Sequence, residues 1–451
     1  MWLKEDNNIN SEQAIEYIEH HGWSRTRLGL ERTRELLFKL DDPQKRLKFI
    51  HVAGSNGKGS ICAMLDAILR KAGYRTGLYT SPYIQDFTER IQVNGECISG
   101  EALARITEHV RTLAEEMDDH PSHFELITAI AMVYFVEQKC DIVVLEVGMG
   151  GELDSTNVID SPEAAVISNI GLEHTEYLGD TIEKIAATKG GIIKSGCNAV
   201  CYDGLPEATE TIRKICLQKG VPLTSVDFSR LTPVSQSLDG QIFIWDKTEY
   251  FLSLLGPHQL HNAAAVLETI EVLRGHGFSV PAEAVKEGLR CVRWPARFEK
   301  ICSKPLFILD GGHNPQGADA LAECIRTLLP EKNIIFLIGI LADKDYTNVL
   351  ATLMPFTKEF ICITPPNDRA LDAKDLAGYL TLRGIKAKAC PDIGSGIRTS
   401  LDAAGPDDVI IAFGSLYLVG AIRTIFPEVY RDHSSLYSGL ESAERTISDR
   451  L

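Results

Sequence analysis

The sequence predicts an α/β protein made of two blocks, each containing a mostly parallel sheet. First, an apolar strand at 48–53 passes through a glycine-rich loop into an amphipathic helix. Second, four apolar residues at 142–145 precede Glu146, a pattern typical of a buried parallel strand. Third, strands expected at 306–309, 334–338, 360–364 and 409–413 alternate with helical patterns. We expect a hinge near 293–298, with a ligand in the cleft between the blocks.

Composition excludes several classes of protein. The 451 residues exceed the size of a single core, which is about 250–300 residues, and 44% hydrophobic with 24% charged content is ordinary for a globular protein. A net charge of −16 argues against a nucleic-acid surface. The polar start and the lack of an apolar run near about 20 residues argue against a signal peptide or membrane span. We therefore expect a cytoplasmic protein whose 11 cysteines are reduced thiols.

The elements of the first block follow from apolar periodicity and turn residues. Two helical patterns cover 11–40, with a loop expected at 27–32. After the helix that follows the glycine loop we expect a strand at 74–79, a turn at 94–95 and helices at 99–117 and 124–138. Further expectations are strands at 141–146 and 164–168, a helix at 181–193, short strands with loops through 198–255, and a helix from 256. The tail after about 428 is expected to be a surface helix or loosely ordered.

The loop at 54–60 carries the main chemical signal. Glycines aim several backbone N–H groups at one point, and the following helix adds unpaired donors and partial positive charge. Lys58 would reach the outer phosphates of a nucleotide, and the Ser60 hydroxyl could hold Mg²⁺. The strict phosphate-loop pattern is not met, because Val52 replaces its first glycine and Gly59 is inserted after the lysine. An ordinary glycine-rich turn therefore stays open on this stretch alone.

Three further residues follow predicted strands, as Lys58 does. They are Ser81, Glu146 and His174, and the carboxyl ends of parallel strands share one edge of a sheet. Carboxylate, imidazole and hydroxyl groups are reasonable ligands for a divalent ion that also binds phosphates. Each residue alone is more often structural, but together they favour a site on this rim.

Polar residues also open the next helix and follow strands of the second block. Gln259 and Asn262 lie three apart and so on one helix face, where they either cap the helix or hydrogen-bond to an adenine. Asp310 and His313 follow the first strand of the second block, and residues 343–345 follow its second strand. These are again positions at the carboxyl edge of a sheet.

Eleven separated stretches, in order, resemble the folylpolyglutamate synthase and dihydrofolate synthase family, which is related to the Mur ligases. They span about residues 12–425 and are Leu28–Arg32, His51–Ser60, Tyr79–Pro82, Glu89–Ile91, Leu145–Gly148, Leu153–Asn157, Lys189–Lys194, Trp294–Arg297, Asp310–Pro315, Leu341–Asp345 and Gly414–Leu418. The resemblance implies an N-terminal P-loop ATPase-like domain at 1–296, with a mostly parallel sheet and folate-binding loops. It also implies a smaller C-terminal Rossmann-like α/β domain at 297–451 that ligates glutamate.

The resemblance further implies an ATP-dependent ligase that adds L-glutamate to a folate carboxylate through an acyl phosphate. Its substrates would be ATP, L-glutamate and either dihydropteroate or tetrahydrofolate, so both dihydrofolate synthase and folylpolyglutamate synthase activities are expected. Two magnesium ions are implied. We expect a monomer with neither a nucleic-acid nor a membrane partner.

Site residues carry over position by position from the resemblance. Residues matching nucleotide contacts are Gly54, Asn56, Gly57, Lys58, Gly59, Ser60, Asn262, Arg297 and Asp310. Those matching magnesium ligands are Ser60, Ser81, Glu146 and His174, while Lys189 matches a lysine that carries a carbamate and helps to hold a second ion. Lys58, His174 and Lys189 are the expected catalytic residues. Those expected to contact substrate are Gly29, Leu30, Glu31, Asp154, Ser155, Thr156, His313 and Ser415.

Four positions depart from the family pattern. The family usually has Asp at Glu173, Ala at Gly190 and Gly312, and often His at Tyr83. The first three changes should spare the chemistry, whereas Tyr83 could alter how a pterin is held.

Two alternatives remain. A Mur-type ligase of cell-wall precursors would use the same acyl-phosphate route, but it predicts a further UDP-binding domain, and only residues 1–47 precede the phosphate strand. A non-catalytic ATP-binding protein would bind ATP without glutamate-dependent release of ADP.

Overall fold

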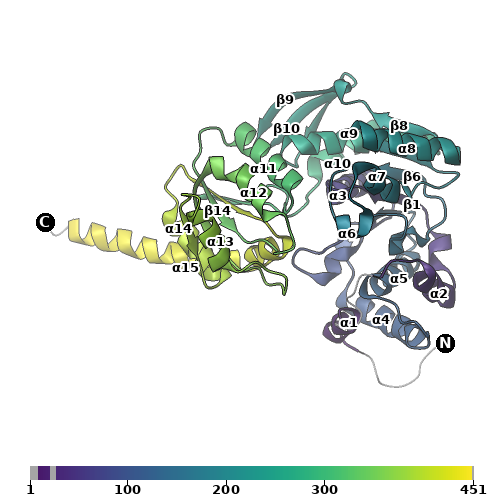
Figure 1. Cartoon of the computed structure of the whole chain (residues 1–451), viewed down its shortest axis with the longest axis horizontal. Coiled ribbons are helices and arrows are strands. Elements are labelled where there is room, and N and C mark those ends of the chain that lie inside the picture. The colour runs from purple at the N-terminus through teal and green to yellow at the C-terminus, as the bar shows by residue number, and fades with distance from the viewer. Residues whose placement is uncertain (1–8, 21–26, 449–451) are drawn as a thin grey trace. The chain divides into compact units, whose positions relative to one another are not determined.

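The computed structural model describes residues 9–20 and 27–448, with side chains described through residue 433. It contains two compact units (Figure 1). The first unit comprises Met1–Ser235, Gln241–Ser253 and His258–Arg293, and the second comprises Gln236–Gly240, Leu254–Pro257 and Trp294–Leu451. Each unit is built around a mostly parallel sheet, which confirms the predicted α/β class.

An eight-stranded sheet organises the first unit, in the order β4-β3-β2-β5-β1-β6-β7-β8. Its strands are β1 (Phe49–Ala53), β2 (Thr76–Tyr79), β3 (Ile91–Val93), β4 (Glu96–Cys97), β5 (Ile142–Glu146), β6 (Ala164–Ile167), β7 (Asn198–Tyr202) and β8 (Leu223–Val226). The six strands from β2 to β8 in this order are parallel, whereas β3 and β4 are antiparallel at one edge. Because β1 lies between β5 and β6, the loops after β2, β5, β1 and β6 follow one another along a single edge.

Helices cover the sheet of the first unit. They are α1 (Ser11–Ile18), α2 (Glu31–Lys39), α3 (Lys58–Lys71), α4 (Gly100–Ala114), α5 (His123–Glu137), α6 (Thr175–Leu178), α7 (Ile182–Gly190), α8 (Pro206–Lys219), α9 (Pro257–Gly275) and α10 (Ala282–Cys291). One buried cluster joins α1, α2, α4 and α5 to strand residues such as Phe49 and Leu145. A second joins α7 and α8 to β6 and β7. Alternate residues of the strands thus pack on opposite faces of the sheet, which explains their unbroken apolar sequences.

A small antiparallel sheet precedes α9. It consists of β9 (Leu231–Ser237), β10 (Gly240–Trp245) and β11 (Thr248–Leu252), in the order β11-β10-β9. A two-residue turn, Leu238 and Asp239, joins β9 to β10. Arg230 at its base forms ion pairs with Asp246 and Glu268 and lies over the Trp245 ring.

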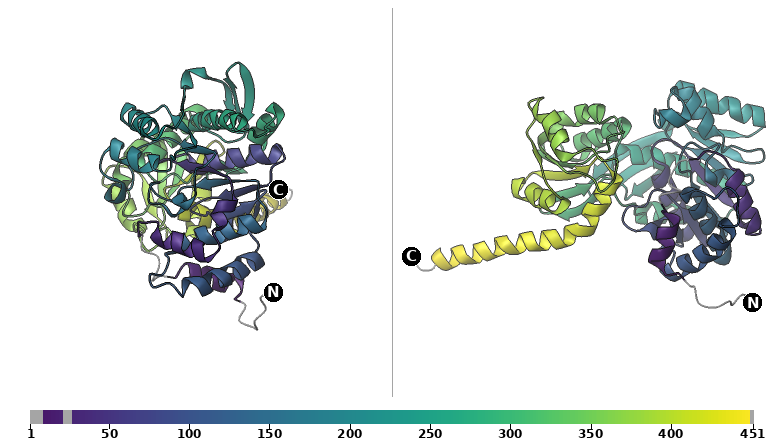
Figure 2. Two further views of the ribbon diagram at one scale, coloured as in Figure 1. Left: turned by 90° about the vertical axis from the view of Figure 1, so that its right-hand side faces the viewer. Right: turned by 60° about the horizontal axis from the view of Figure 1, so that its bottom comes forward.

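A six-stranded sheet organises the second unit, in the order β12-β13-β17-β14-β15-β16. The strands are β12 (Glu299–Ser303), β13 (Leu306–Leu309), β14 (Ile334–Ile338), β15 (Thr357–Cys362), β16 (Ala387–Ala389) and β17 (Val409–Phe413). The helices are α11 (Pro315–Leu328), α12 (Tyr346–Leu353), α13 (Ala373–Thr381), α14 (Ile393–Ala403) and α15 (Leu416–Ser448), the last drawn in yellow (Figure 2). All pairings are parallel except that of β12 with β13. The four predicted strands are present, and the two edge strands were not predicted.

Two expectations for local structure were wrong. The segment 27–32 is not entirely a loop, because α2 begins at Glu31. The stretch 198–255 contains a full helix, α8, between β7 and β8, where only short strands and loops were expected. Pro206 in the first turn of α8 is a helix-start signal that could have located it.

The 11 cysteines all lie within the described part of the chain and are free thiols. Most are buried, whereas Cys97 and Cys291 are exposed and Cys302 is intermediate. Burial raises the pKa of thiols such as Cys140, Cys201 and Cys362 to about 12, so these side chains behave as small hydrophobic groups. Within residues 9–20 and 27–448, none of the helices combines the length and apolar composition needed to cross a bilayer.

Candidate active site

The glycine-rich loop at 54–57 joins the end of β1 to the start of α3. Gly54 has a φ of 143° and Gly57 a φ of 88°, a region that favours glycine. A Cβ atom at Gly54 would lie 1.8 Å from Oγ of Ser168, and one at Gly57 would lie 2.5 Å from Oδ1 of Asn262. Neighbouring side chains and backbone conformation therefore both exclude larger residues at these two positions.

The segment after β6 holds this loop in place. The backbone N–H of Ser55 donates to the carbonyl of Asn169 at 2.7 Å, and the Ser168 hydroxyl donates to the carbonyl of Asn56 at 2.7 Å. The cap of α3 is Gly57, which has no side chain to accept a hydrogen bond from the N–H groups of the first turn. A fixed loop with uncapped helix donors is suited to bind an anion.

Lys58 and Lys189 meet at this loop. The Nζ atom of Lys58, the first residue of α3, donates to the carbonyl oxygens of Gly54 at 3.0 Å and Ser55 at 3.2 Å. Nζ of Lys189, near the end of α7, donates to the same Gly54 oxygen at 2.9 Å. The structure thus brings together two of the three predicted catalytic residues.

Lys189 is 1% exposed and forms an ion pair with Glu173, with Nζ 2.5 Å from Oε1. Burial lowers the pKa of Lys189 to about 8; the Glu173 charge opposes that shift and the Lys58 charge adds to it. Burial alone would raise the pKa of Glu173, but the charges of Lys189 and Lys58 lower it overall. Glu173, noted in the sequence only as a departure from the family pattern, is therefore the carboxylate partner of the buried lysine.

Ser81 and Glu146 lie together at the ends of neighbouring strands. The backbone N–H of Ser81, which follows β2, donates to Oε2 of Glu146 at the end of β5, at 3.1 Å. Glu146 is 5% exposed. The register that pairs β2 with β5 and β5 with β1 places both residues beside the phosphate loop, as the strand-end argument predicts.

His174 follows Glu173 and precedes α6, in left-handed conformation with a φ of 45°. It lies in the loop after β6, the strand on the other side of β1. Among the described residues, no group of three or more His, Cys, Asp and Glu side chains is arranged to hold a metal ion. Glu146 and His174 would therefore need hydroxyl oxygens, such as those of Ser60 and Ser81, and nucleotide oxygens to complete an ion's shell. That donor set fits Mg²⁺, which is usually bound by one or two carboxylates together with substrate phosphates.

Asp154 and Thr156 are buried and bonded to one another. The Asp154 carboxylate accepts hydrogen bonds from the backbone N–H groups of Met149 and Thr156, at 2.8 and 3.0 Å, and from the Thr156 hydroxyl at 2.5 Å. Nε2 of His51 on β1 lies 2.8 Å from the same hydroxyl oxygen. These contacts tie the loop after β5 to the central strand, and Ser155 between them is 8% exposed.

The two segments predicted to contact substrate are connected through α5. Leu30 is the buried cap of α2 and Glu31 is its exposed first residue, and the following Arg32 donates from Nε to Oε2 of Glu125 on α5 at 3.0 Å. Phe124, also on α5, lies so close to Gly148 that a Cβ atom there would be 2.5 Å from its ring. Helix α2, which begins just after Gly29, and the loop that contains Gly148 and Asp154 therefore contact the same helix.

The amides predicted to contact adenine face the phosphate loop. Nε2 of Gln259 donates to Oγ of Ser60 at 3.2 Å, and Nδ2 of Asn262 donates to Oε1 of Gln259 at 3.0 Å. The hydroxyl of Tyr202 donates to Oδ1 of Asn262 at 2.5 Å. The capping interpretation is insufficient, because both amides are buried and bonded to other side chains.

The remaining predicted residues gather in the second unit. Asp310 follows β13, is buried, and accepts hydrogen bonds from the backbone N–H groups of Phe298 at 3.0 Å and Gly312 at 2.8 Å. Burial raises the pKa of Asp310, and the N–H of Gly312, the Arg297 charge and the N–H of Phe298 oppose that shift. Arg297 donates to the carbonyl of Ala296 at 2.9 Å.

His313 and Ser415 follow the neighbouring strands β13 and β17. Nδ1 of His313 lies 3.0 Å from the carbonyl oxygen of Gly311, so Nδ1 carries a proton in this hydrogen bond. Ser415 is 3% exposed, and within the described chain its hydroxyl oxygen has no hydrogen-bond partner. The N–H of Gly414 donates to the carbonyl of Gly312 at 3.1 Å and joins the two loops.

Three residues that form hydrogen bonds or ion pairs within the candidate site were not predicted from the sequence as site residues: Glu173, His51 and Tyr202. His51 and Tyr202 lie within or at the end of predicted strands, where a polar ring is an available signal. Their partners come from distant segments, so spacing along the chain could not identify them.

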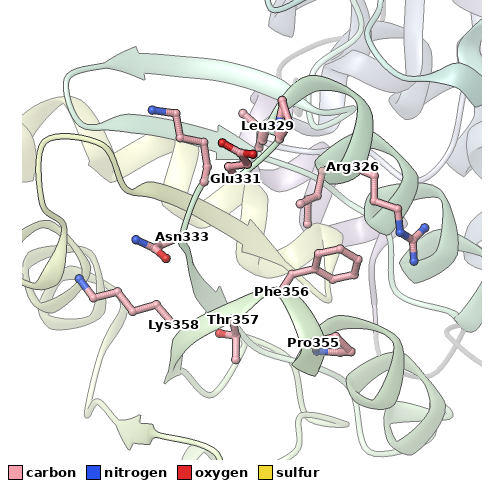
Figure 3. Close-up of a pocket in the computed structure, with 11 residues that line it drawn as sticks. Arg326, Leu329, Glu331, Asn333, Pro355, Phe356, Thr357 and Lys358 are labelled. Atoms are coloured by element: carbon pink, nitrogen blue, oxygen red, sulfur yellow. The ribbon is translucent and has the colours of Figure 1, made fainter.

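A cavity of about 580 Å³ lies elsewhere in the second unit (Figure 3). It is bordered by the end of α11 and the starts of β14 and β15, the sheet edge opposite to Asp310 and Ser415. Two of its cations are already paired, Lys332 with Asp407 and Lys358 with Asp408. It is therefore separate from the predicted residues of this unit.

Comparison with known proteins identifies two domains. The Mur ligase middle domain matches residues 52–270, and the Mur ligase, glutamate ligase domain matches residues 296–416. The chain is 34% identical to the dihydrofolate synthase/folylpolyglutamate synthase of Bacillus subtilis (strain 168), over 90% of this chain and 98% of that protein.

Solved structures resemble the fold along nearly the whole chain. Mycobacterium tuberculosis folylpolyglutamate synthase complexed with ADP and AMPPCP has a TM-score of 0.85 and 31% identity, covering 92% of this chain and 99% of that one. E. coli FolC in complex with DHPP and ADP has a TM-score of 0.83 and 28% identity, covering 94% and 99%. The bifunctional folylpolyglutamate synthase/dihydrofolate synthase from Yersinia pestis CO92, complexed with AMPPNP and Mn ion, has a TM-score of 0.81 and 29% identity, covering 94% and 100%.

Proposed function

The chain belongs to the folylpolyglutamate synthase and dihydrofolate synthase family of the Mur ligases, and from this premise we propose that it joins L-glutamate to a folate carboxylate at the expense of ATP. The observation that carries the proposal is the phosphate loop, where Lys58 and Lys189 bind one carbonyl oxygen beside Glu146 and Ser81. An anion cradle with two lysines and a buried carboxylate is what phosphoryl transfer to an acid requires.

The first chemical problem is charge. The substrate carboxylate must approach the γ-phosphate, and both are anions. The N–H groups of the loop and of the first turn of α3 bind phosphate oxygens, and Lys58 neutralises the charge that develops on them. The present partners of Lys58 are neutral carbonyls. Its ammonium group can therefore move from these carbonyls to a phosphate oxygen without breaking an ion pair.

Divalent metal is part of the proposal. Ser60, Ser81, Glu146 and His174 would hold magnesium, which when bound would neutralise phosphate charge. The donor set and the manganese-containing relative support a divalent ion. A second ion near Lys189 is proposed from the family resemblance.

Lys189 is proposed to carry a carbamate. Formation needs the neutral amine, whose nitrogen attacks the carbon of CO₂ and then releases a proton. The lowered pKa of Lys189 favours the neutral amine, whereas the Glu173 ion pair stabilises the ammonium form. Conversion would therefore require the Glu173 carboxylate to leave Nζ.

The second unit is proposed to complete the reaction. We assign residues 1–296 to ATP and folate binding and residues 297–451 to glutamate ligation. Asn262, Arg297 and Asp310 are proposed nucleotide contacts, and His313 and Ser415 are proposed substrate contacts. The buried and unpartnered hydroxyl of Ser415 supports the last assignment.

Both acceptor activities are proposed. The segments 29–31 and 154–156 would contribute to the pterin site, because the adjoining Arg32 and Gly148 both contact α5. The buried Asp154 and Thr156 would shape the loop. The relative that binds DHPP supports dihydropteroate as one acceptor class. A monomer acting in the cytoplasm completes the proposal, and the free thiols accord with a reducing compartment.

The test is release of ADP with dihydropteroate or tetrahydrofolate, each with and without L-glutamate. We expect release with both acceptors only when glutamate is present, together with a product heavier by one glutamate. If glutamate-dependent ADP release occurred with tetrahydrofolate but not with dihydropteroate, the dihydrofolate synthase assignment would be wrong. Activity only with a UDP-sugar peptide would favour the Mur-type alternative, and nucleotide binding without turnover would favour a non-catalytic protein.

A further inference from the structure

A chain of hydrogen bonds runs from the end of β7 to the phosphate loop. It begins at the Tyr202 hydroxyl, passes through Asn262 and Gln259, and ends at Oγ of Ser60, with donor–acceptor distances of 2.5, 3.0 and 3.2 Å. Asn262 and Gln259 are 3% and 1% exposed, and Ser60 is 1% exposed. The buried polar atoms in this series of hydrogen bonds therefore depend on one another as hydrogen-bond partners.

Two arrangements of the amides could join these groups. In the observed one, Asn262 accepts from Tyr202 and donates to Gln259, which donates to Ser60. If both amides were inverted, Ser60 would donate to Gln259 and Asn262 would donate to Tyr202. The Tyr202 proton would then lose Asn262 Oδ1, the acceptor it has among the described residues.

Tyr202 selects the observed arrangement because it must donate. Burial raises the pKa of its hydroxyl, so the proton stays on the oxygen. Its ring is held by Phe228, with ring centroids 5.1 Å apart in an edge-on arrangement. Asn262 in turn lies against Gly57, where no Cβ atom could fit.

The arrangement determines what Ser60 can offer to a ligand. Its oxygen accepts from Gln259, so its own proton is not used by that amide and one lone pair also remains. A hydroxyl in this state can donate to a phosphate oxygen. In the inverted arrangement the proton would be consumed by Gln259.

We propose that Tyr202 is a positioning residue that, through Asn262 and Gln259, keeps the Ser60 hydroxyl proton available for the nucleotide phosphates. The inference rests on the proposed ATP-dependent function and adds a residue that acts without touching the substrate.

The test is a double-mutant cycle read by calorimetric binding of ADP in the presence of Mg²⁺. Tyr202→Phe keeps the ring against Phe228 and removes only the hydroxyl. We expect it to weaken ADP binding about three- to tenfold, the effect of one hydrogen bond. In a Ser60→Ala background, Tyr202→Phe should cause less than about twofold further loss.

Tyr74→Phe is the matched control, because the Tyr74 hydroxyl bonds to the N–H of Ser279 beyond the other end of α9, at 2.7 Å. It should bind ADP as the unmodified protein does. The proposal would be overturned if Tyr202→Phe weakened ADP binding equally in the unmodified and Ser60→Ala backgrounds, or if it did not weaken ADP binding at all. If Tyr202→Phe does not fold, as judged by thermal unfolding, Gln259→Leu replaces it with the same expectation. Failure of the unmodified protein to bind ADP would instead overturn the proposed function itself.

Discussion

Lys58 and Lys189 donate to the same oxygen atom, the carbonyl of Gly54, at 3.0 and 2.9 Å. Glu173 forms an ion pair with Lys189, whereas the ammonium of Lys58 donates to the backbone carbonyls of Gly54 and Ser55. The two lysines therefore differ in their surroundings: Lys189 is paired with a carboxylate, and Lys58 with neutral carbonyl oxygens.

Lys58→Ala should reduce kcat/KM for glutamate-dependent ADP release at least about a hundredfold, because one electrostatic contact to the reacting phosphates is lost. The fold should survive, since only two hydrogen bonds to loop carbonyls disappear. Lys71→Ala, in the last turn of the same helix, is the control and should keep near-full activity. Near-full ADP release by Lys58→Ala would refute the assigned role.

Lys189→Ala should lose most activity whether or not bicarbonate is supplied. The unmodified protein should lose activity in CO₂-free buffer and regain it when bicarbonate is added, because the carbamate would be lost and reformed. Lys184→Ala, five residues earlier on α7 and paired with Asp180, should behave as the unmodified protein. Rates that are indifferent to bicarbonate would argue against the carbamate, and an active Lys189→Ala would also exclude a catalytic lysine.

His51 should make the protein less stable as the pH falls. Burial first, and then the charge of Lys194, lower its pKa from 6.5 to about 3. Between these values the unfolded chain binds a proton that the folded chain does not, so the free energy of unfolding falls as pH decreases from about 6.5 towards 3. The full effect is on the order of a few kcal/mol, at about 1.4 kcal/mol per pKa unit.

Urea unfolding at pH 5 and pH 7 measures this effect. His51→Gln should reduce the difference in unfolding free energy between the two pH values. It should not abolish the difference, because burial, followed by the Arg90 charge, also lowers the pKa of His123, to about 4. An unchanged pH dependence in His51→Gln would show that His51 does not titrate as described.

Gly57→Ala should weaken ADP binding at least about tenfold. The new methyl group would lie 2.5 Å from Oδ1 of Asn262, and the φ of 88° is unfavourable for alanine. Gly378→Ala is the control, because it lies in α13 with no atom near its added methyl group. It should bind ADP normally and unfold at an equal or slightly higher temperature. Normal ADP binding by Gly57→Ala would show that Asn262 can move away.

The sequence predicted the parts of this fold that depend on local pattern. The strand, loop and helix at 48–69 and the positions of Ser81, Glu146 and His174 after parallel strands follow from periodicity and from the shared edge of a sheet. Helix α8 was missed because its flanking short strands suggested a continuing β region. Edge strands β12 and β16 were missed because partly exposed strands lack an apolar run.

Partners within the site could not be predicted from the sequence. Glu173 and Lys189 are separated by the short helix α6 and most of α7, and His51 and Thr156 by four strands. Tyr202 and Asn262 are separated by α8, β8 and the small antiparallel sheet. Only tertiary packing brings these pairs within 2.5–2.8 Å. The residue types indicated that these side chains could take part in chemistry. Which side chain pairs with which could be read only from the folded structure.

The distribution of thiols provides points for attaching spectroscopic probes. Cys291 is exposed in the first unit and Cys302 is partly exposed in the second, whereas most others are buried. After Cys97→Ser removes the remaining exposed thiol, a donor and an acceptor fluorophore on Cys291 and Cys302 would report energy transfer between the two units. Titration with ATP, a pterin acid and glutamate would then follow any movement of the units step by step, without adding a new cysteine.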